Sequence, residues 1–445
     1  MSTQRAAIPY RIDRLPASRY LSKISVVLLL AYLFEAIDNG AVGYFLPFFA
    51  KEFALNATQL GYVGAISNVG VMIGAISSGI LADRLGRKKL IAFSMFFWGF
   101  SGLVLAWSPN IYVLLIGRIL IGIGVGAEVP PVLALLNELL PSKLRSLYFS
   151  ICLAFFPLGA CIAGLLSFFL VPTIGWRGVA IVEAIPALAG LLVLKVVPES
   201  PSWLESKGRI DEADAIITKV EQETEKQTGK PLPEVKILEH VTSLSFVKQG
   251  TFKDLFKKEH IKSTLMVTIW WPTALAAIYG LMTWFSTLLI GKGFTVSKSI
   301  GYVSLMYAAG VIGIPFVRYA VEKIGRKWTA IMGGILTAIA AYFYGGAATV
   351  TTLFIFGILY NVFSNGSAMV NNLYTPELFP TYIRASGTGY ASSVGRIGAI
   401  AGPIIIGYIM QAYGVPAVFY FAVAMFVTYT IAIALLGHET KGLVH

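Results

Sequence analysis

The sequence has 445 residues, of which 56% are hydrophobic and only 13% are charged. Charged residues make up about 25% of an ordinary soluble domain, so this composition excludes a water-soluble globular protein and predicts a chain that crosses a membrane many times. The formal net charge of +12 then indicates basic loops at a membrane surface, and we expect no nucleic-acid partner.

Twelve apolar runs are long enough to cross the hydrocarbon core of a bilayer as helices, which takes about 20 residues each. Their expected bounds are 24–49, 60–82, 89–108, 111–138, 146–171, 176–197, 264–290, 298–321, 328–347, 351–375, 385–411 and 414–437. A long polar segment follows the sixth run, and within it RIDEADAIITKVEQE and TFKDLFKKEH have the pattern of short helices. The expected fold is an all-α membrane protein with twelve transmembrane helices and a central loop.

Lysine and arginine are concentrated in alternate loops, including GRKK after the second run and KLR after the fourth. The loops on the other side, SPN, TIGW and AYG, contain neither residue. Because basic loops stay in the cytoplasm, we expect a multi-pass protein of the plasma membrane with both termini and the central loop cytoplasmic. The expected segments are a tail 1–23, a six-helix bundle 24–198, a linker 199–262, a second bundle 263–438 and a tail 439–445.

Two charged stretches recur at a fixed offset of 239 residues. GILADRLGRKK (79–89) matches YAVEKIGRKW (319–328), and NELLPSKLRS (137–146) matches PELFPTYIRA (376–385). The two bundles are therefore expected to be parallel repeats, an arrangement typical of transporters that rock around a site at the repeat interface.

The recurring charges lie at the cytoplasmic ends of the expected helices, where ion pairs can form and break as the bundles rock. We expect a gate built on Asp83 and Glu322; the alternative is that these residues only set the topology. The full set of expected gating residues is Asp83, Arg87, Glu138, Arg145, Glu322, Arg326, Glu377, Arg384, Glu199 and Glu439.

Ionisable residues inside a membrane span are unfavourable unless they serve a function. Asp38 lies near the middle of the first run, with Glu35 one turn before it, and Glu128 lies in the fourth run. All four histidines lie outside the runs, so a carboxylate must carry any coupled proton and no histidine metal site is expected there. Asp38 is the first candidate for proton coupling, and Glu35 and Glu128 are the further candidates; the alternative for Asp38 is a structural carboxylate.

Arg396 lies near the middle of the eleventh run, and the residue 239 positions earlier is Pro157, so this arginine is not part of the symmetric scaffold. An arginine at that depth needs an anion, and its planar guanidinium group suits a carboxylate. We expect Arg396 to bind a carboxylate of the substrate; the alternative is a permanent ion pair with Glu128 or Asp38.

Aromatic and amide side chains in other runs are expected to complete a cavity for a flat molecule, with ordinary packing as the alternative. The expected lining residues besides Arg396 and Asp38 are Tyr279, Trp284, Asn365, Tyr307 and Asn68. No nucleotide-binding loop appears, and no nucleophile, base and orienting group fall together. We therefore expect neither a cofactor nor enzymatic activity.

Several of these stretches resemble signatures of the major facilitator superfamily. GILADRLGRKK and GRILIGIGVG (117–126) resemble its loop and fourth-helix motifs, and PESPSWL (198–204) and HETKG (438–442) resemble the ends of the two halves in its sugar-porter and organic-ion branches. FEAIDNG (34–40), GVGAEVPP (124–131), YTPELFPTYIRASGTG (374–389) and GRIGAIAGPIIIG (395–407) resemble the bacterial niacin transporter branch, which is related to synaptic vesicle glycoproteins and organic ion transporters. The chain departs from the pattern at Ser202, where arginine is usual, and at His438, where proline is usual.

The resemblance implies a monomeric, proton-coupled symporter of a small organic anion, such as the aromatic monocarboxylate nicotinate, in which Arg118 supports coupling. Three alternatives stay open: a sugar–proton symporter, an organic cation transporter and a receptor-like member that does not transport. The sugar branch usually carries paired glutamines in helix 7, where this sequence reads IWWPTALAAIYG. Cation transporters tend to carry an acid, rather than an arginine, in helix 11.

Overall fold

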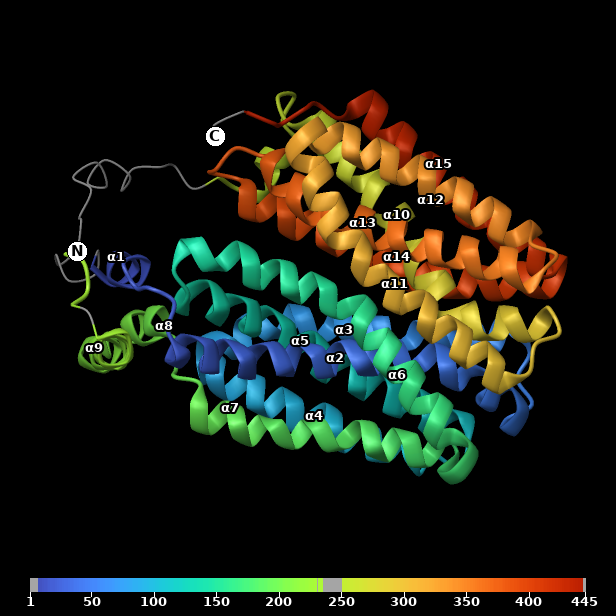
Figure 1. The fold of residues 1–445 in the computed structure, drawn as a ribbon, viewed down its shortest axis with the longest axis horizontal. Helices are drawn as coiled ribbons and strands as arrows, with labels where there is room; N and C mark the ends of the chain where they lie inside the picture. The colour runs from blue at the N-terminus through green and yellow to red at the C-terminus, as the bar shows by residue number, and fades with distance from the viewer. Residues whose placement is uncertain (1–6, 230, 235–249, 443–445) are drawn as a thin grey trace. The chain divides into compact units, whose positions relative to one another are not determined.

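The computed structural model describes residues 7–229, 231–234 and 250–442; the rest of the expected tails and linker lies outside the described residues. The described chain is helical and contains no strand, which confirms the expected all-α fold (Figure 1). The helices of the first part are α1 (Ala7–Asp13), α2 (Arg19–Glu52), α3 (Ala57–Leu85), α4 (Arg87–Ala106), α5 (Ile111–Leu139), α6 (Ser142–Ala184), η1 (Ile185–Ala189) and α7 (Gly190–Val196). Those that follow are α8 (Pro201–Ser206), α9 (Ile210–Thr228), η3 (Phe252–Phe256), α10 (Ile261–Gly291), α11 (Val296–Ile324), α12 (Arg326–Gly346), α13 (Val350–Glu377), α14 (Arg384–Tyr413) and α15 (Val415–Leu436).

Eleven helical stretches of the described chain are long and apolar enough to cross a membrane. One of them, Ser142–Val196, has 55 residues and is broken at Gly175, where φ is 70° and ψ is 173°. Only glycine adopts such a conformation readily, so the chain turns back there and this stretch supplies two crossings. The eleven stretches therefore give the twelve crossings that the sequence predicts.

The backbone repeats the offset seen in the sequence. Gly86, between α3 and α4, has a φ of 89°, and Gly325, between α11 and α12, has a φ of 91°. Gly175 and Gly414, again 239 residues apart, have φ values of 70° and 79°. A side chain at any of these four positions would be strained, so the same glycine-dependent turns connect equivalent helices of the two repeats.

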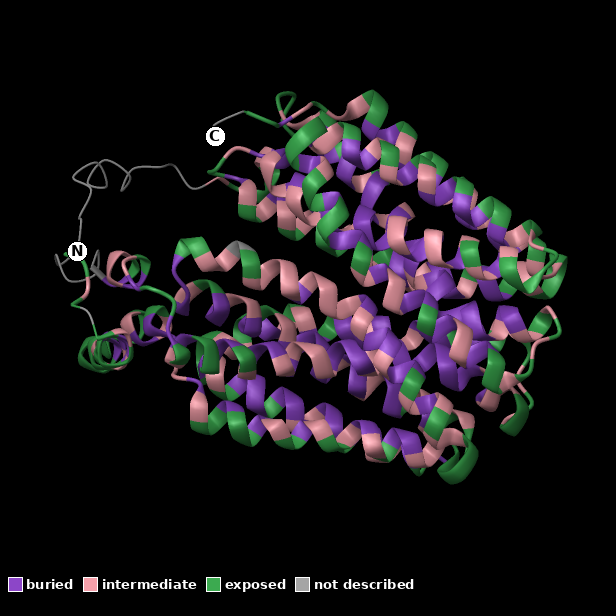
Figure 2. Cartoon of the chain, in the orientation of Figure 1, coloured by how far each residue is buried: buried purple, intermediate pink, exposed green. Residues whose placement is uncertain are grey.

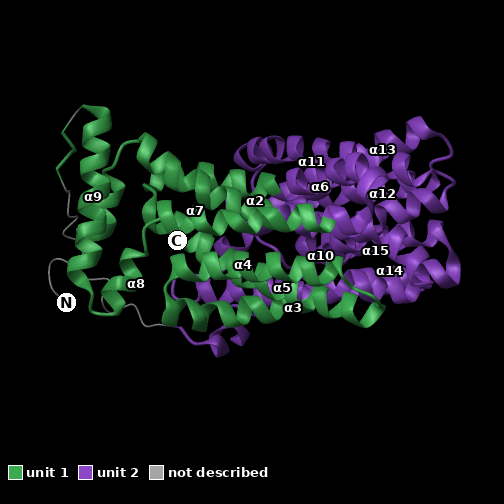
Figure 3. Cartoon of the chain, turned by 90° about the horizontal axis from the view of Figure 1, so that it is seen from below, with its two compact units in different colours: residues 1–35, 69–155, 180–246 green, residues 36–68, 156–179, 247–445 purple. Residues whose placement is uncertain are grey.

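Two compact units divide the chain, and their boundaries cut through helices (Figure 3). Unit 1 contains residues 1–35, 69–155 and 180–246, and unit 2 contains residues 36–68, 156–179 and 247–445. Each of α2, α3 and α6 passes from one unit into the other. Unit 2 thus combines one end of α2, one end of α3 and the middle of α6 with the whole second repeat. The division into bundles 24–198 and 263–438 stays a prediction.

Small residues bring helices into close contact within unit 1. A Cβ atom on Gly74 of α3 would lie 2.1 Å from the carbonyl oxygen of Ile123 in α5, and one on Gly126 of α5 would lie 2.2 Å from that of Val71. Closely spaced glycines permit this approach between membrane helices. Figure 2 shows the burial of each helix, and large apolar residues such as Ile76 and Phe100 are exposed, as suits a surface that faces lipid.

In unit 2, α10 and α14 pack along much of their length. A Cβ atom on Gly398 would lie 2.0 Å from the carbonyl oxygen of Pro272, and one on Gly402 would lie 2.2 Å from that of Ala276. These glycines fix which face of α14 lies against α10, and so decide where the neighbouring Arg396 lies. This glycine pair therefore serves the packing of α14 on α10.

Candidate functional site

We use the term linker side for the helix ends next to α8 in unit 1 and for the equivalent ends of the second repeat in unit 2. In unit 1, Arg87 at the start of α4 forms an ion pair with Glu138 at the end of α5. The Ser200 hydroxyl donates to the same carboxylate, and the backbone N–H of Lys88 donates to Glu199 over 3.0 Å. Glu199 thereby supplies an acceptor to the otherwise unsatisfied N-terminus of α4.

The second repeat forms the same cluster in unit 2. Arg326 binds Glu377 through two nitrogens, with an Nη2–Oε1 distance of 2.8 Å and an Nε–Oε2 distance of 2.9 Å. Thr440 donates to Glu377, and Glu439 accepts from the backbone N–H groups of Arg326 and Lys327 over 2.9 and 3.2 Å. Burial alone would raise the pKa of the Glu439 carboxyl group, but hydrogen bonds from backbone N–H groups outweigh burial and lower it.

Four other expected gating residues lie outside these two clusters. Asp83 is exposed, and its backbone carbonyl accepts from Trp203 Nε1 over 2.9 Å. Glu322 is 3.7 Å from Arg318 on its own helix, in an exposed pair. Arg145 and Arg384 instead donate to backbone carbonyls, those of Leu140 over 2.7 Å and Phe379 over 3.5 Å. Arg87 and Arg326 therefore pair with Glu138 and Glu377, and not with Asp83 and Glu322.

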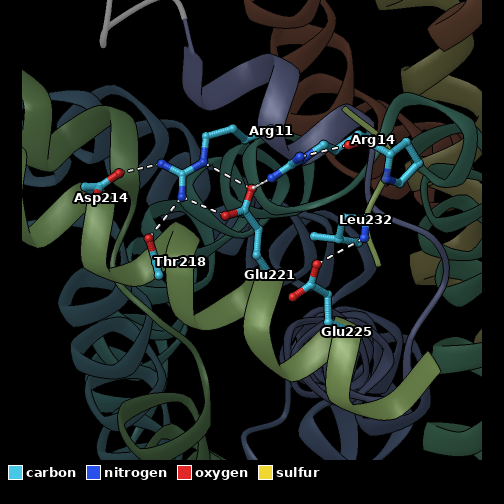
Figure 4. A network of polar contacts seen from close by, with 8 residues as sticks. Arg11, Arg14, Asp214, Thr218, Glu221, Glu225 and Leu232 are labelled. Atoms are coloured by element: carbon cyan, nitrogen blue, oxygen red, sulfur yellow. Dashed lines mark hydrogen bonds and ion pairs between the residues drawn. The ribbon is translucent and has the colours of Figure 1, made fainter. Parts of the chain in front are cut away.

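The N-terminal segment is folded onto α9, which the sequence did not predict (Figure 4). Arg11 donates to Glu221 from Nε over 3.1 Å and from Nη2 over 2.7 Å, and Arg14 donates to the same carboxylate over 2.6 Å. Ile8 and Ile12 of α1 pack in a buried cluster with Ile217 of α9. We call residues 7–21 the N-terminal strap.

The N-terminal strap also reaches the turn between α5 and α6. The carboxylate of Asp13 accepts from the backbone N–H of Ser142 over 2.8 Å, and Arg145 lies 3.7 Å from the same oxygen. A single short segment therefore connects the linker helix to a membrane-helix terminus of unit 1.

Replacing Glu221 with glutamine is expected to loosen the strap. Burial alone would raise the pKa of the Glu221 carboxyl group, but hydrogen bonds from Arg11 and Arg14 outweigh burial and lower it. A carboxyl group with a lowered pKa stabilises the fold above its unfolded pKa of about 4.3, and the contribution disappears as the pH falls through the folded value. The substitution should remove about 1–3 kcal/mol from strap docking, together with this acid-induced loosening.

Hydrogen exchange of residues 7–21 measures both effects. Glu223→Gln is the matched control, because Glu223 lies on the same helix and forms no ion pair with another described residue. Equal exchange in the Glu221→Gln protein and the wild type would contradict the assignment.

Within the membrane part of unit 1, Arg118 and Glu128 are both buried on α5. Glu128 Oε2 accepts from Trp98 Nε1 of α4 over 2.7 Å. Glu35 of α2 is also buried and lies within electrostatic range of Glu128. Trp98 is a polar partner that sequence reasoning missed; its place on a span next to the Glu128 helix was the only available signal.

In unit 2, Arg396 lies half-buried at the centre of α14. No hydrogen bond or ion pair joins it to another described residue of unit 2, so it forms no permanent pair with Asp38 in that unit. Arg396, Ala399 and Pro403 lie at i, i+3 and i+7, and therefore share one face of the helix.

That face of α14 lies against α3. Asn68 Nδ2 donates to the carbonyl oxygen of Ala399 over 3.3 Å. Pro403 has no N–H with which to bond this carbonyl within the helix, so Asn68 satisfies an acceptor that the proline leaves open. Asn68 thus lies one helical turn from Arg396 and bonds to the backbone of α14.

The same two helices stay in contact up to the side opposite the linker. A Cβ atom on Gly61 would lie 2.8 Å from the carbonyl oxygen of Pro403, and one on Gly407 would lie 2.5 Å from that of Ala57. At the end of this contact, the Thr58 hydroxyl donates to Gln411 over 2.7 Å. We call this line of contacts the α3–α14 seam. Its end toward the linker side reaches the turn that carries Arg396.

The other expected lining residues occupy different environments in unit 2. Asp38 and Tyr279 are half-buried, and the ring of Tyr279 lies 5.7 Å from that of Phe156. Trp284 is fully buried and donates to the carbonyl oxygen of Pro403 over 3.0 Å, so it packs under the seam. Asn365 is buried and donates to the carbonyl of Asn361 over 2.8 Å; Tyr307 is buried too, with no partner for its hydroxyl in the described chain.

An open surface groove of about 390 Å³ lies in unit 2, between α12 and α15. Its walls are almost entirely apolar and include Ile339, Phe343 and Val427. This lining offers nothing to bind a charged molecule, so the polar candidate site is at Arg396.

Comparison with known proteins agrees with this architecture. The profile of the sugar (and other) transporter family matches residues 24–445. The chain belongs to this family. The family is part of the major facilitator superfamily, so the chain is a multi-pass membrane transporter and not an enzyme.

Two curated relatives are similar to almost the whole chain. The niacin transporter NiaP of Acinetobacter baylyi is 33% identical over 435 residues, which cover 97% of each chain. The 4-hydroxybenzoate transporter PcaK of the same organism is 30% identical over 408 residues, which cover 90% of this chain and 88% of PcaK. Among solved structures, the inward open conformation of the xylose transporter XylE from E. coli has a TM-score of 0.76 and 20% identity, and it covers 95% of this chain and 97% of XylE; it supports the fold alone.

Proposed function

We propose that the protein is a proton-coupled symporter that takes up a small aromatic monocarboxylate such as nicotinate by alternating access. The observation that carries this proposal is Arg396, a half-buried arginine at mid-span with no partner in the described chain. A charge at that depth is unfavourable unless an anion meets it, and the guanidinium fork suits a carboxylate.

Unit 2 also offers aromatic side chains for an aromatic ring on the substrate. Tyr279 and Phe156 are within ring-contact distance of each other in the same unit as Arg396. Aromatic pairs of this kind bind a flat ring by stacking or edge contacts. The names of the relatives add support, because NiaP and PcaK are described as transporters of niacin and 4-hydroxybenzoate, and both compounds are aromatic acids.

A sugar–proton symporter is the second candidate, favoured by the family name and by the xylose transporters among the similar structures. Sugar recognition needs many hydrogen-bonding side chains. Trp270 and Trp271 of α10 use their indole N–H groups on Asn371 and Thr375 of α13, which leaves those donors engaged within the protein. An organic cation would in turn be repelled by Arg396. A receptor-like protein that does not transport has no use for proton coupling, so proton-driven uptake would distinguish the proposed symporter from it.

In this proposal the protein is a monomer in the plasma membrane. Its linker side faces the cytoplasm. The Arg87–Glu138 cluster of unit 1 and the Arg326–Glu377 cluster of unit 2 occupy equivalent helix ends of the two repeats, which favours them as ion pairs that form and break during the transport cycle. The α3–α14 seam closes the opposite side.

A binding screen on the purified protein tests the substrate class. Nicotinate, benzoate and 4-hydroxybenzoate are expected to raise the melting temperature, because a ligand that binds only the folded state stabilises it. Nicotinamide, xylose and a quaternary amine are expected to leave the melting temperature unchanged. Stabilisation by xylose and not by the acids would favour the sugar symporter.

Replacing Asp38 with asparagine is expected to uncouple transport from the proton gradient. The amide imitates a permanently protonated carboxyl group, so it can no longer take a proton on one side and release it on the other. In proteoliposomes the ratio of gradient-driven accumulation to substrate exchange should fall at least about tenfold, which corresponds to about 1.4 kcal/mol of lost coupling. If the Asp38→Asn protein still concentrates substrate in response to a pH gradient, Asp38 is not the coupling group.

A further inference from the structure

Glu128 and Trp98 form a buried carboxyl–indole pair that belongs to unit 1, whereas Arg396 belongs to unit 2. Glu128 has no exposed surface, and Trp98 is 2% exposed. The indole N–H donates to Oε2 over 2.7 Å, while Oε1 has no hydrogen-bond partner in the described chain. A buried carboxylate normally needs a cation or several donors, and this one has a single neutral donor.

The local backbone holds this pair in place. A Cβ atom on Gly124 would lie 2.7 Å from the Cβ of Trp98, so glycine lets α4 approach α5 one turn before Glu128. Pro131 lacks the N–H that would bond the carbonyl of Ala127, and the Ser78 hydroxyl of α3 donates to that carbonyl over 2.9 Å. The pair therefore lies where α4 and α5 approach closely, and α3 bonds to the backbone of the residue before Glu128.

The charged groups near Glu128 favour neutralisation by a proton. On α2 the nearest is Glu35, another buried carboxyl group within electrostatic range. On its own helix Arg118 lies ten residues away, about 15 Å along the axis. The basic residues of α4, Arg87–Lys89, begin at its linker-side terminus, while the stretch of α3 that packs on α5 presents Gly70, Gly74 and Ser78. No basic side chain of the described chain forms an ion pair with Glu128.

We propose that Glu128 is a proton-binding site of the transport cycle and that Trp98 positions it. The free oxygen Oε1 accepts the proton when the cycle loads it, and the indole N–H holds Oε2 and stabilises the ionised form after release. The step moves one proton onto and off one carboxylate oxygen, and no other bond changes. This inference rests on the proposed proton coupling and adds the place where a proton is held in unit 1.

The test uses purified full-length protein in liposomes loaded with a pH dye, with nicotinate and 4-hydroxybenzoate as probes. In Glu128→Gln the ratio of gradient-driven accumulation to exchange is expected to fall at least about tenfold. In Trp98→Phe, which keeps a ring but removes the donor, the midpoint of the pH–uptake profile is expected to move about one unit toward higher pH. Trp107→Phe is the matched control at the end of the same helix, because Trp107 is 72% exposed; its profile should match the wild type.

The outcomes separate this inference from the proposed function. If the wild type does not accumulate either acid under an imposed pH gradient, the proposed function fails. If the wild type accumulates an acid and Glu128→Gln does so equally well, Glu128 is a structural residue and the inference fails. A Trp98→Phe midpoint identical to that of Trp107→Phe overturns the positioning role. Should Glu128→Gln not fold, two other measurements decide the question. The first is the Trp98→Phe midpoint. The second is the infrared band of the protonated carboxyl group in Glu128→Asp, which should disappear at high pH if this position releases a proton.

Discussion

Arg396→Lys protein is expected to bind nicotinate about 10- to 100-fold more weakly than the wild type. Lysine keeps the positive charge but loses the planar two-nitrogen fork, and a hydrogen bond to a charged group contributes about 1.5–3 kcal/mol. Arg396→Gln, which also removes the charge, should bind more weakly still. Isothermal titration calorimetry on the purified protein measures both.

Two comparisons make this result specific. Arg318→Lys is the matched control, because Arg318 lies in the same unit and is exposed, with its partner Glu322 on its own helix. It should bind nicotinate like the wild type. Nicotinamide lacks the carboxylate, so any weak binding of this amide should be the same in all four proteins. If Arg396→Lys binds nicotinate as tightly as the wild type, Arg396 does not bind the carboxylate.

Gly61→Ala is expected to shift the conformational equilibrium toward an open α3–α14 seam. The added methyl group would lie 2.8 Å from the carbonyl oxygen of Pro403 and 3.1 Å from the Cα of Ile404, and neither backbone atom can move aside as a side-chain tip can. Overpacking of this kind costs about 1–3 kcal/mol, which converts to a roughly 5- to 150-fold change in the ratio of closed to open molecules.

Spin labels at the exposed positions Tyr62 and Tyr408 report the separation of the two helices, and the native Cys152 and Cys161 are buried. Gly79→Ala on the same helix is the control, because no atom lies within 4 Å of the place that its added methyl group would occupy. Gly74→Ala, which meets α5 inside unit 1, should lower the melting temperature without changing the label distance. An unchanged distance distribution in Gly61→Ala would show that the seam does not set the equilibrium.

The transmembrane fold could be predicted because two signals that are readable in the sequence determine it. Runs of about 20 apolar residues fix the crossings, and an offset of 239 residues pairs the repeats. Gly175 and Gly414 show why the second signal is reliable: both have a positive φ that only glycine adopts readily, so each turn preserves its glycine.

The partners within the linker-side clusters could not be predicted in the same way. Asp83 lies one helical turn before Arg87, which suggests a local pair, yet Arg87 binds Glu138 from another helix. The turn at Gly86 separates the two helices and leaves Asp83 exposed. Helix packing, and not sequence distance, decides which acid meets the arginine.

The N-terminal strap was missed for a related reason. Its helix α1 has only seven residues, too few for an apolar period to show, and the partners of Arg11 lie more than 200 residues later in the chain. A basic N-terminus next to a membrane span is adequately explained by topology alone. Only the fold reveals that these charges have specific acidic partners.

At the candidate site, residue types were easier to predict than roles. That Asn68 and Trp284 line a cavity stays a prediction; what the sequence did not indicate is that each donates a hydrogen bond to the α14 backbone, at Ala399 and Pro403. Pro403 opens the first of these acceptors, and a single proline in an apolar run does not reveal which side chain will fill it. Arg396 was found because a charge at mid-span is conspicuous in any sequence.

Uptake of radiolabelled nicotinate into proteoliposomes that hold only this protein tests the central claim most directly. With the outside acidic and the inside neutral, nicotinate is expected to accumulate above its external concentration, and a protonophore or the Arg396→Gln substitution should abolish this accumulation. Equilibration without accumulation, or accumulation of xylose in place of nicotinate under the same gradient, would contradict the proposed proton-coupled uptake.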